Sequence, residues 1–171
     1  MGKGSFISPE QRSGLRARIE PIALAMSRAG LTPNMLTIIG FAIASAGGVL
    51  AAVEWWVLAG IVATAGAGFD MFDGAVARAT GQVSKRGAFM DSVFDRWGEG
   101  VVYVGILIGA TQAGLALGAW LAGAALVSAF MVSYTRAKSE SLGFSSGTGM
   151  AAIGLAPREV RTVILGVAVV A

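Results

Sequence analysis

An uncharged run of 19 residues, Met35 to Val53, sets the strongest limit on what this chain can fold into. A helix of that length crosses a hydrocarbon core of about 30 Å. The chain is 55% apolar and only 13% charged, which is too few charges to cover a water-soluble surface. Four further apolar stretches follow, at residues 55–69, 87–110, 113–132 and from about 160 to the end. We therefore predict an all-α integral membrane protein built as a helix bundle.

The basic residues predict how the bundle lies in the membrane. All 13 can be placed on one side: Lys3, Arg12, Arg16, Arg18, Arg28, Arg78, Lys85, Arg86, Arg96, Arg136, Lys138, Arg158 and Arg161. The connections on the other side, near Glu54 and at residues 111–118, contain no Lys or Arg. Because Lys and Arg favour cytoplasmic loops, we expect a multi-pass cell-membrane protein with a cytoplasmic N-terminus.

The chain divides into two parts by the distribution of charge. In residues 1–30, arginines alternate with apolar residues over Pro9 to Arg28, which is unlike a signal peptide and predicts an amphipathic helix lying at the lipid interface. Residues 31–171 form the expected membrane bundle, with the fifth span incomplete at Ala171. Glycines at positions 47, 48, 66 and 68 predict close approach of helices within the lipid.

The absence of histidine and cysteine restricts the chemistry. It excludes disulfides, thiolate nucleophiles, Cys/His zinc sites and imidazole acid–base catalysis. Any reaction must therefore use carboxylates, hydroxyls, Lys or Arg. We expect the lipid bilayer as a partner and no nucleic acid.

Two pairs of aspartates provide the candidate site. Asp70 and Asp73 share one helix face, and Asp91 and Asp95 share a face of the next helix. The short connection predicts that the two helices are antiparallel neighbours, so that four carboxylates converge at the cytoplasmic edge of the membrane. Such an all-oxygen cluster favours Mg²⁺, Mn²⁺ or Ca²⁺, and two bridged ions suit phosphoryl transfer. A cation transporter or a purely structural membrane subunit is the alternative.

The spacing D-x2-D-G-x2-A-R-x8-G-x3-D-x3-D resembles the signature of the CDP-alcohol phosphotransferase family. It is filled without a gap over Asp70 to Asp95. The resemblance implies six spans, the sixth absent here, and a homodimer. It also implies that a CDP-linked lipid, CDP-diacylglycerol, gives its phosphatidyl group to an alcohol with release of CMP.

The same resemblance implies roles for individual residues. Asp70, Asp73, Asp91 and Asp95 would hold two Mg²⁺ or Mn²⁺ ions, and Asp95 would also be the general base. The positions expected to bind the CDP-lipid are Pro33, Asn34, Gly74, Arg78, Ser84 and Gly87.

A second basic cluster bears on the acceptor alcohol. Arg136 and Lys138, with Arg158 and Arg161, suit an acceptor that carries a phosphate. The pattern is similar to actinobacterial phosphatidylinositol phosphate synthases, whose acceptor is inositol 1-phosphate, although Lys and Arg are exchanged and Glu159 replaces a proline. Positive-inside topology alone could also account for the cluster. Archaeal relatives using other inositol phosphates, and phosphatidylglycerophosphate synthases using glycerol 3-phosphate, remain alternatives.

Overall fold

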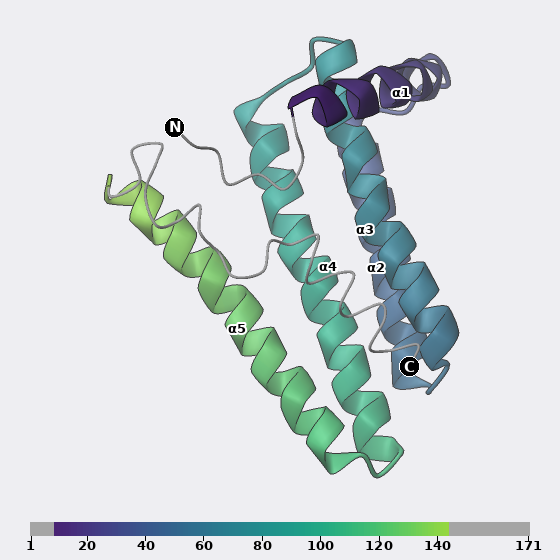
Figure 1. The fold of residues 1–171 in the computed structure, drawn as a ribbon, viewed down its shortest axis with the longest axis vertical. Coiled ribbons are helices and arrows are strands. Elements are labelled where there is room, and N and C mark those ends of the chain that lie inside the picture. Colours follow the sequence, from purple (N-terminus) through teal and green to yellow (C-terminus); the bar gives the residue numbers. More distant parts are fainter. Residues whose placement is uncertain (1–8, 144–171) are drawn as a thin grey trace.

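The computed structural model describes residues 9–143, with side chains from Ile19 onward apart from that of Asp70. This part of the chain is entirely helical between its turns (Figure 1). Its elements are α1 (Pro9–Arg28), α2 (Pro33–Ala52), α3 (Trp56–Ala79), α4 (Lys85–Gln112) and α5 (Ala116–Ser141). The prediction of an all-α membrane protein is confirmed.

Three of the described helices, α2, α3 and α5, are long and apolar enough to cross a membrane. Helix α4 is longer than any of them, at 28 residues, but it carries acidic and basic residues in its first half. Arg96 and Glu99, one turn apart on α4, form an ion pair that neutralises two of these charges. The predicted fifth span, beyond residue 143, lies outside the described residues.

Two helix starts are defined by hydroxyl caps. The Thr32 side chain accepts a hydrogen bond from the Met35 amide at 3.3 Å, and Pro33 occupies the first turn of α2, where its missing N–H costs nothing. The Ser84 hydroxyl accepts from the Gly87 amide at 3.0 Å and starts α4. Gly30, with φ +86°, ends the turn after α1 in the left-handed region that glycine tolerates.

Helix α2 is the centre of the bundle. It packs along both α3 and α4, while α5 packs on α4 and α1 lies across the end of the bundle against α3 (Figure 1). Helices α3 and α4 run antiparallel, as expected, but as neighbours they touch only marginally, because α2 packs against both. The physical reason is that α2 presents small residues on two faces and fits between them.

The contacts of α2 are close enough to exclude a β-carbon. A Cβ on Gly47 would lie 2.7 Å from the backbone nitrogen of Ala63 on α3. A Cβ on Gly48 would lie 2.7 Å from the carbonyl oxygen of Val101 on α4. Close packing of this kind is what associates helices in lipid, where burial from water gives no driving force.

Helix α3 contributes one predicted contact of the same kind and lacks another. A Cβ on Gly66 would lie 2.6 Å from the Ala44 backbone nitrogen, so the prediction for Gly66 is confirmed. For Gly68 no such contact occurs among the described residues, because no described atom lies within 4 Å of where its Cβ would be. Two residues along a helix turn the chain by about 200°, which carries Gly68 away from α2.

An apolar cluster fixes α1 against the bundle. Ala23 of α1, Leu36 of α2 and Val76 of α3 are fully buried together. The partly buried side chains packed against them are Met26, Leu31, Phe69, Phe72 and Ala75. The cluster joins the start of α2 to the last turns of α3, which is the region that contains Asp73.

Substitution of the two α3 glycines tests this packing. Gly66→Ala should lower the free energy of unfolding by about 1–3 kcal/mol, because a backbone atom of α2 blocks the new methyl group. Gly68→Ala is the matched control and should be neutral or stabilising by up to about 1 kcal/mol, because alanine favours the helix. Thermal unfolding of the purified protein in detergent measures both, and equal melting temperatures for the two variants would contradict the packing.

Candidate active site

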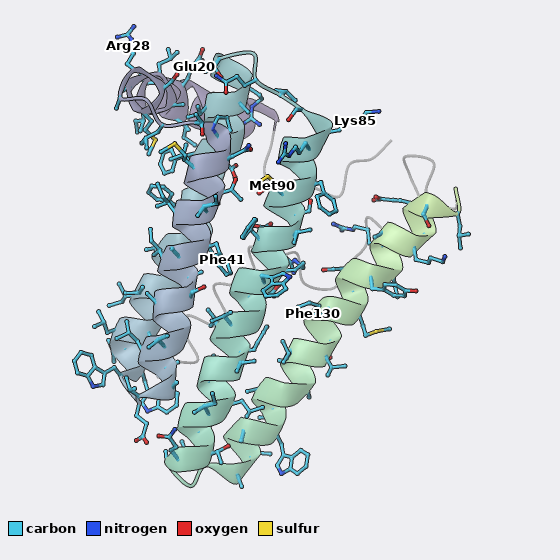
Figure 2. The ribbon with its side chains drawn as sticks, turned by 180° about the vertical axis from the view of Figure 1, so that it is seen from behind. Glu20, Arg28, Phe41, Lys85, Met90 and Phe130 are labelled. Atoms are coloured by element: carbon cyan, nitrogen blue, oxygen red, sulfur yellow. The ribbon has the colours of Figure 1, made fainter. Side chains whose placement is uncertain are left out.

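Three chain segments lie together at one end of the bundle, and α5 ends on the same side, apart from them. The start of α2, the end of α3 and the start of α4 lie at the end that α1 crosses, whereas α5 diverges from α4 toward this side of the bundle (Figure 1). Figure 2 shows Arg28 of α1 and Lys85 of α4 at this end. The other described basic residues near these helix ends are Arg78, Arg86, Arg136 and Lys138. The opposite turns, after α2 and after α4, contain none, as the sequence predicted.

Asp73 is held in the interface between α3 and α2. Its side chain is 6% exposed, and its Oδ2 accepts a hydrogen bond of 2.6 Å from the Thr37 hydroxyl on α2. Thr37 is itself 4% exposed. Thr37 belongs to none of the motifs in the sequence, where its one signal is a hydroxyl among apolar residues of a helix.

Asp91 and Asp95 lie on the first half of α4, and both are half-buried. One carboxylate oxygen of Asp95, Oδ1, is shielded from solvent. The ring of the intervening Phe94 packs edge-on against Phe41 of α2, with ring centres 5.2 Å apart. Figure 2 shows Phe41 in the region between α2 and α4. This contact sets the position of α4 along α2 at the level of the two carboxylates.

The acidic residues have the chemistry of a hard-cation site. Every candidate ligand is a carboxylate, and carboxylate oxygens suit Mg²⁺ or Mn²⁺. Asp73 and one oxygen of Asp95 are buried, and a buried carboxylate needs a positive charge, such as a bound cation, beside it. Among the described side chains, which do not include that of Asp70, no three acidic residues form a metal-binding group. Convergence of all four aspartates therefore stays a prediction.

The residues expected to bind CDP-lipid gather in two places at this end. A Cβ on Gly87 would lie 3.1 Å from Ser84 Oγ and 3.7 Å from Asn34 Oδ1, so the starts of α2 and α4 lie together. Pro33 begins α2 beside Asn34. One turn of α3 brings Arg78 over Gly74, where a Cβ would lie 3.1 Å from Arg78 Nη1. Both groups are formed by polar atoms available to an anionic ligand.

The residues expected to bind the acceptor are only partly described. Arg136 and Lys138 are exposed on the last turns of α5. Helix α5 packs on α4 where the Phe130 ring covers Gly100, at 3.2 Å from the position of its absent Cβ. Arg158 and Arg161 lie outside the described residues.

Comparisons with known proteins agree with this arrangement. The model of the CDP-alcohol phosphatidyltransferase family matches residues 30–171. The chain is 39% identical to an archaetidylinositol phosphate synthase of Pyrococcus horikoshii over 92% of this chain and 79% of the relative.

Two solved structures of phosphatidylinositol phosphate synthase from Mycobacterium tuberculosis are also similar to this chain. One has CDP-DAG bound and aligns with a TM-score of 0.79 at 30% identity, covering 89% of this chain and 75% of that one. The other is in complex with manganese and citrate and aligns with a TM-score of 0.69 at 28% identity, covering 89% and 83%.

The Ser84 cap provides a test of the local geometry. Ser84→Ala should lower the free energy of unfolding by about 1 kcal/mol, because the Gly87 amide loses its acceptor at the start of α4. Ser92→Ala on the same helix is the control; its hydroxyl donates to the Ala88 carbonyl, and its loss should change stability by less than about 0.5 kcal/mol. Unfolding in detergent without substrate measures both, and an unchanged Ser84→Ala variant would contradict the cap.

Proposed function

The chain belongs to the CDP-alcohol phosphatidyltransferase family and is a membrane-bound transferase, and we propose that it transfers the phosphatidyl group of CDP-diacylglycerol to inositol 1-phosphate with release of CMP. The observation that carries this proposal is the grouping of the candidate CDP-lipid residues. Asn34, Ser84 and Gly87 lie together at the end of the bundle that contains Asp73 and Asp95.

The aspartates are the proposed metal ligands. Asp70 and Asp73 on α3, with Asp91 and Asp95 on α4, would hold two divalent cations, Mg²⁺ or Mn²⁺. A bound divalent ion neutralises the pyrophosphate of the donor and polarises the phosphorus that is attacked. The manganese complex of the Mycobacterium tuberculosis relative supports a divalent ion.

Asp95 is the proposed general base. It takes the proton from the acceptor hydroxyl, whose oxygen then attacks the phosphorus that carries the lipid. The bond from that phosphorus to the bridging oxygen breaks, and CMP leaves with the bonding electrons. A carboxylate fits this role because the chain has no histidine.

Arg78 and Gly74 on α3, with Gly87 at the start of α4, are proposed to bind the donor's CDP moiety. The guanidinium lies against α3 at Gly74, where a methyl group would press on it. Such a cation binds phosphate oxygens through several N–H donors at once. The Ser84 hydroxyl and the Asn34 amide supply polar contacts from the other two helices, and Pro33 fixes the entry to α2.

The basic residues of α5 and beyond are proposed to bind the acceptor's phosphate. Arg136 and Lys138 end α5, and Arg158 and Arg161 follow in the chain. The names of the Pyrococcus and Mycobacterium relatives share an inositol phosphate head group and differ in the lipid. This shared head group supports inositol 1-phosphate over glycerol 3-phosphate, the acceptor of a phosphatidylglycerophosphate synthase.

The charge asymmetry supports an orientation for the site. We place the basic end of the bundle, and with it the N-terminus and the reaction, at the cytoplasmic face of the cell membrane. Helix α1 lies there as a helix at the lipid interface. The functional form is proposed to be a homodimer.

An acceptor screen tests the proposed reaction. The protein in detergent with CDP-diacylglycerol and Mg²⁺ or Mn²⁺ should release CMP when inositol 1-phosphate is added, and at least about 10-fold more slowly with inositol, serine or glycerol 3-phosphate. Chelation of the metal should stop the release. Preference for glycerol 3-phosphate would identify a phosphatidylglycerophosphate synthase, and cation flux into liposomes without CMP release would support transport.

Neutralisation of the proposed base tests the mechanism. Asp95→Asn should lower the rate of CMP release by about 10²–10⁴-fold, because the amide cannot take the acceptor's proton. Its elution profile and melting temperature should remain those of a folded protein. Glu54→Gln, in the turn at the far end of the bundle, is the matched control and should retain full activity. Full turnover by Asp95→Asn would refute the assignment of the base.

A further inference from the structure

One side-chain hydrogen bond connects α2 to an expected metal ligand. The Thr37 hydroxyl donates to Asp73 Oδ2 at 2.6 Å, and both side chains are withdrawn from solvent. That length lies in the range of O–H···O⁻ bonds to an ionised acceptor, about 2.5–2.7 Å. The bond links the central helix α2 directly to an acidic residue of α3.

The single proton of Thr37 has a second acceptor within reach. The Pro33 carbonyl oxygen, one turn earlier on α2, lies 3.2 Å from the same hydroxyl. A hydroxyl donates one hydrogen bond, so the shorter bond to the carboxylate is the one it makes when Asp73 is ionised. The proton then engages Oδ2 from the α2 side.

The surroundings of the pair hold it in one geometry. Threonine is branched at Cβ, so its side chain has few rotamers on a helix. The fully buried Leu36 and Val76 lie beside the pair, one residue from Thr37 and one helical turn from Asp73. Farther along the same interface, the contact of Gly66 with Ala44 fixes α2 against α3. Rotation of the Asp73 carboxylate would therefore break its bond to Thr37.

We propose that Thr37 is a positioning residue for divalent-cation binding. It orients the Asp73 carboxylate from the neighbouring helix and touches neither substrate nor the reacting atoms. The inference rests on the proposed function in one respect, that Asp73 is a metal ligand. The proposal gives α2 a function beyond its proposed contacts to CDP-lipid. This central helix also orients the side chain of a proposed metal-binding residue, Asp73, on α3.

Metal binding by the full chain in detergent, without substrate, tests the proposal. Mn²⁺ titration followed by electron paramagnetic resonance should give a dissociation constant about 10–100-fold weaker for Thr37→Val, which keeps the shape and removes the hydroxyl. Thr37→Ser keeps the hydroxyl and should stay within about 3-fold of the parent protein. Thr111→Val, which removes a hydroxyl from the far end of α4, should bind as the parent does.

A double-mutant cycle separates orientation of Asp73 from general stability. In an Asp73→Asn background, Thr37→Val should weaken Mn²⁺ binding no further, because the carboxylate that Thr37 orients is already absent. An equal loss in both backgrounds, or an unchanged affinity of Thr37→Val alone, would overturn the proposal. If Thr37→Val does not fold, Thr37→Ala replaces it in the cycle.

The two proposals fail in different ways. A parent protein that binds Mn²⁺ and loses affinity on Thr37→Val, yet releases no CMP, would refute the proposed reaction and leave the positioning proposal supported. Normal CMP release by the parent protein, together with an unchanged Mn²⁺ affinity of Thr37→Val, would support the proposed reaction and refute the positioning proposal. Absence of any Mn²⁺ binding by the parent protein would overturn the positioning proposal.

Discussion

The close contact of α2 with α3 and α4 is the interaction on which the rest of the structure depends. In lipid, apolar side chains gain nothing by leaving the solvent, so helices associate through shape and short-range attraction. Gly47 and Gly48 let two neighbours approach α2 on adjoining faces, where a methyl group would meet backbone atoms. The bundle is consequently organised around one slender helix, and the helices that carry the aspartates are placed by it.

This arrangement explains how the candidate site is assembled from distant parts of the chain. The acidic pairs of α3 and α4 lie on helices that scarcely touch, and α2 relates one to the other. Its Thr37 hydroxyl donates a hydrogen bond to Asp73 on α3. Its Phe41 ring packs against Phe94, which lies between Asp91 and Asp95 on α4. The start of the same helix brings Asn34 beside Gly87. Packing and chemistry therefore depend on the same turns of α2.

Much of the fold was predictable from local sequence, because uncharged runs of membrane length have few other solutions. The helix α3 extends past its apolar run at Phe69 to Ala79, where alanines continue the helix among polar residues. The placement of α2 between α3 and α4 was not predictable. A short connection indicates antiparallel direction, but which faces meet depends on where small residues fall around each helix. Gly66 and Gly68 look alike in sequence and differ only in the direction they face.

The site residues that belong to a motif of fixed spacing could be predicted from the sequence. Asp70 to Asp95 could be recognised by spacing, and the grouping of Ser84 and Gly87 follows from a helix cap. Thr37 belongs to no such pattern, because its significance comes from a helix 36 residues away in the chain. Arg158 and Arg161 lie beyond the described residues and remain sequence-based candidates.

The ion pair of Arg96 with Glu99 has a consequence for how the protein is made. Both partners belong to α4 and lie one turn apart, so they can pair as soon as that helix has formed. A pair shared between two helices would leave each segment charged until its counterpart arrived. Charged residues impede the passage of a nascent segment from the translocation machinery into lipid. For these two residues, insertion of α4 need not wait for its neighbours.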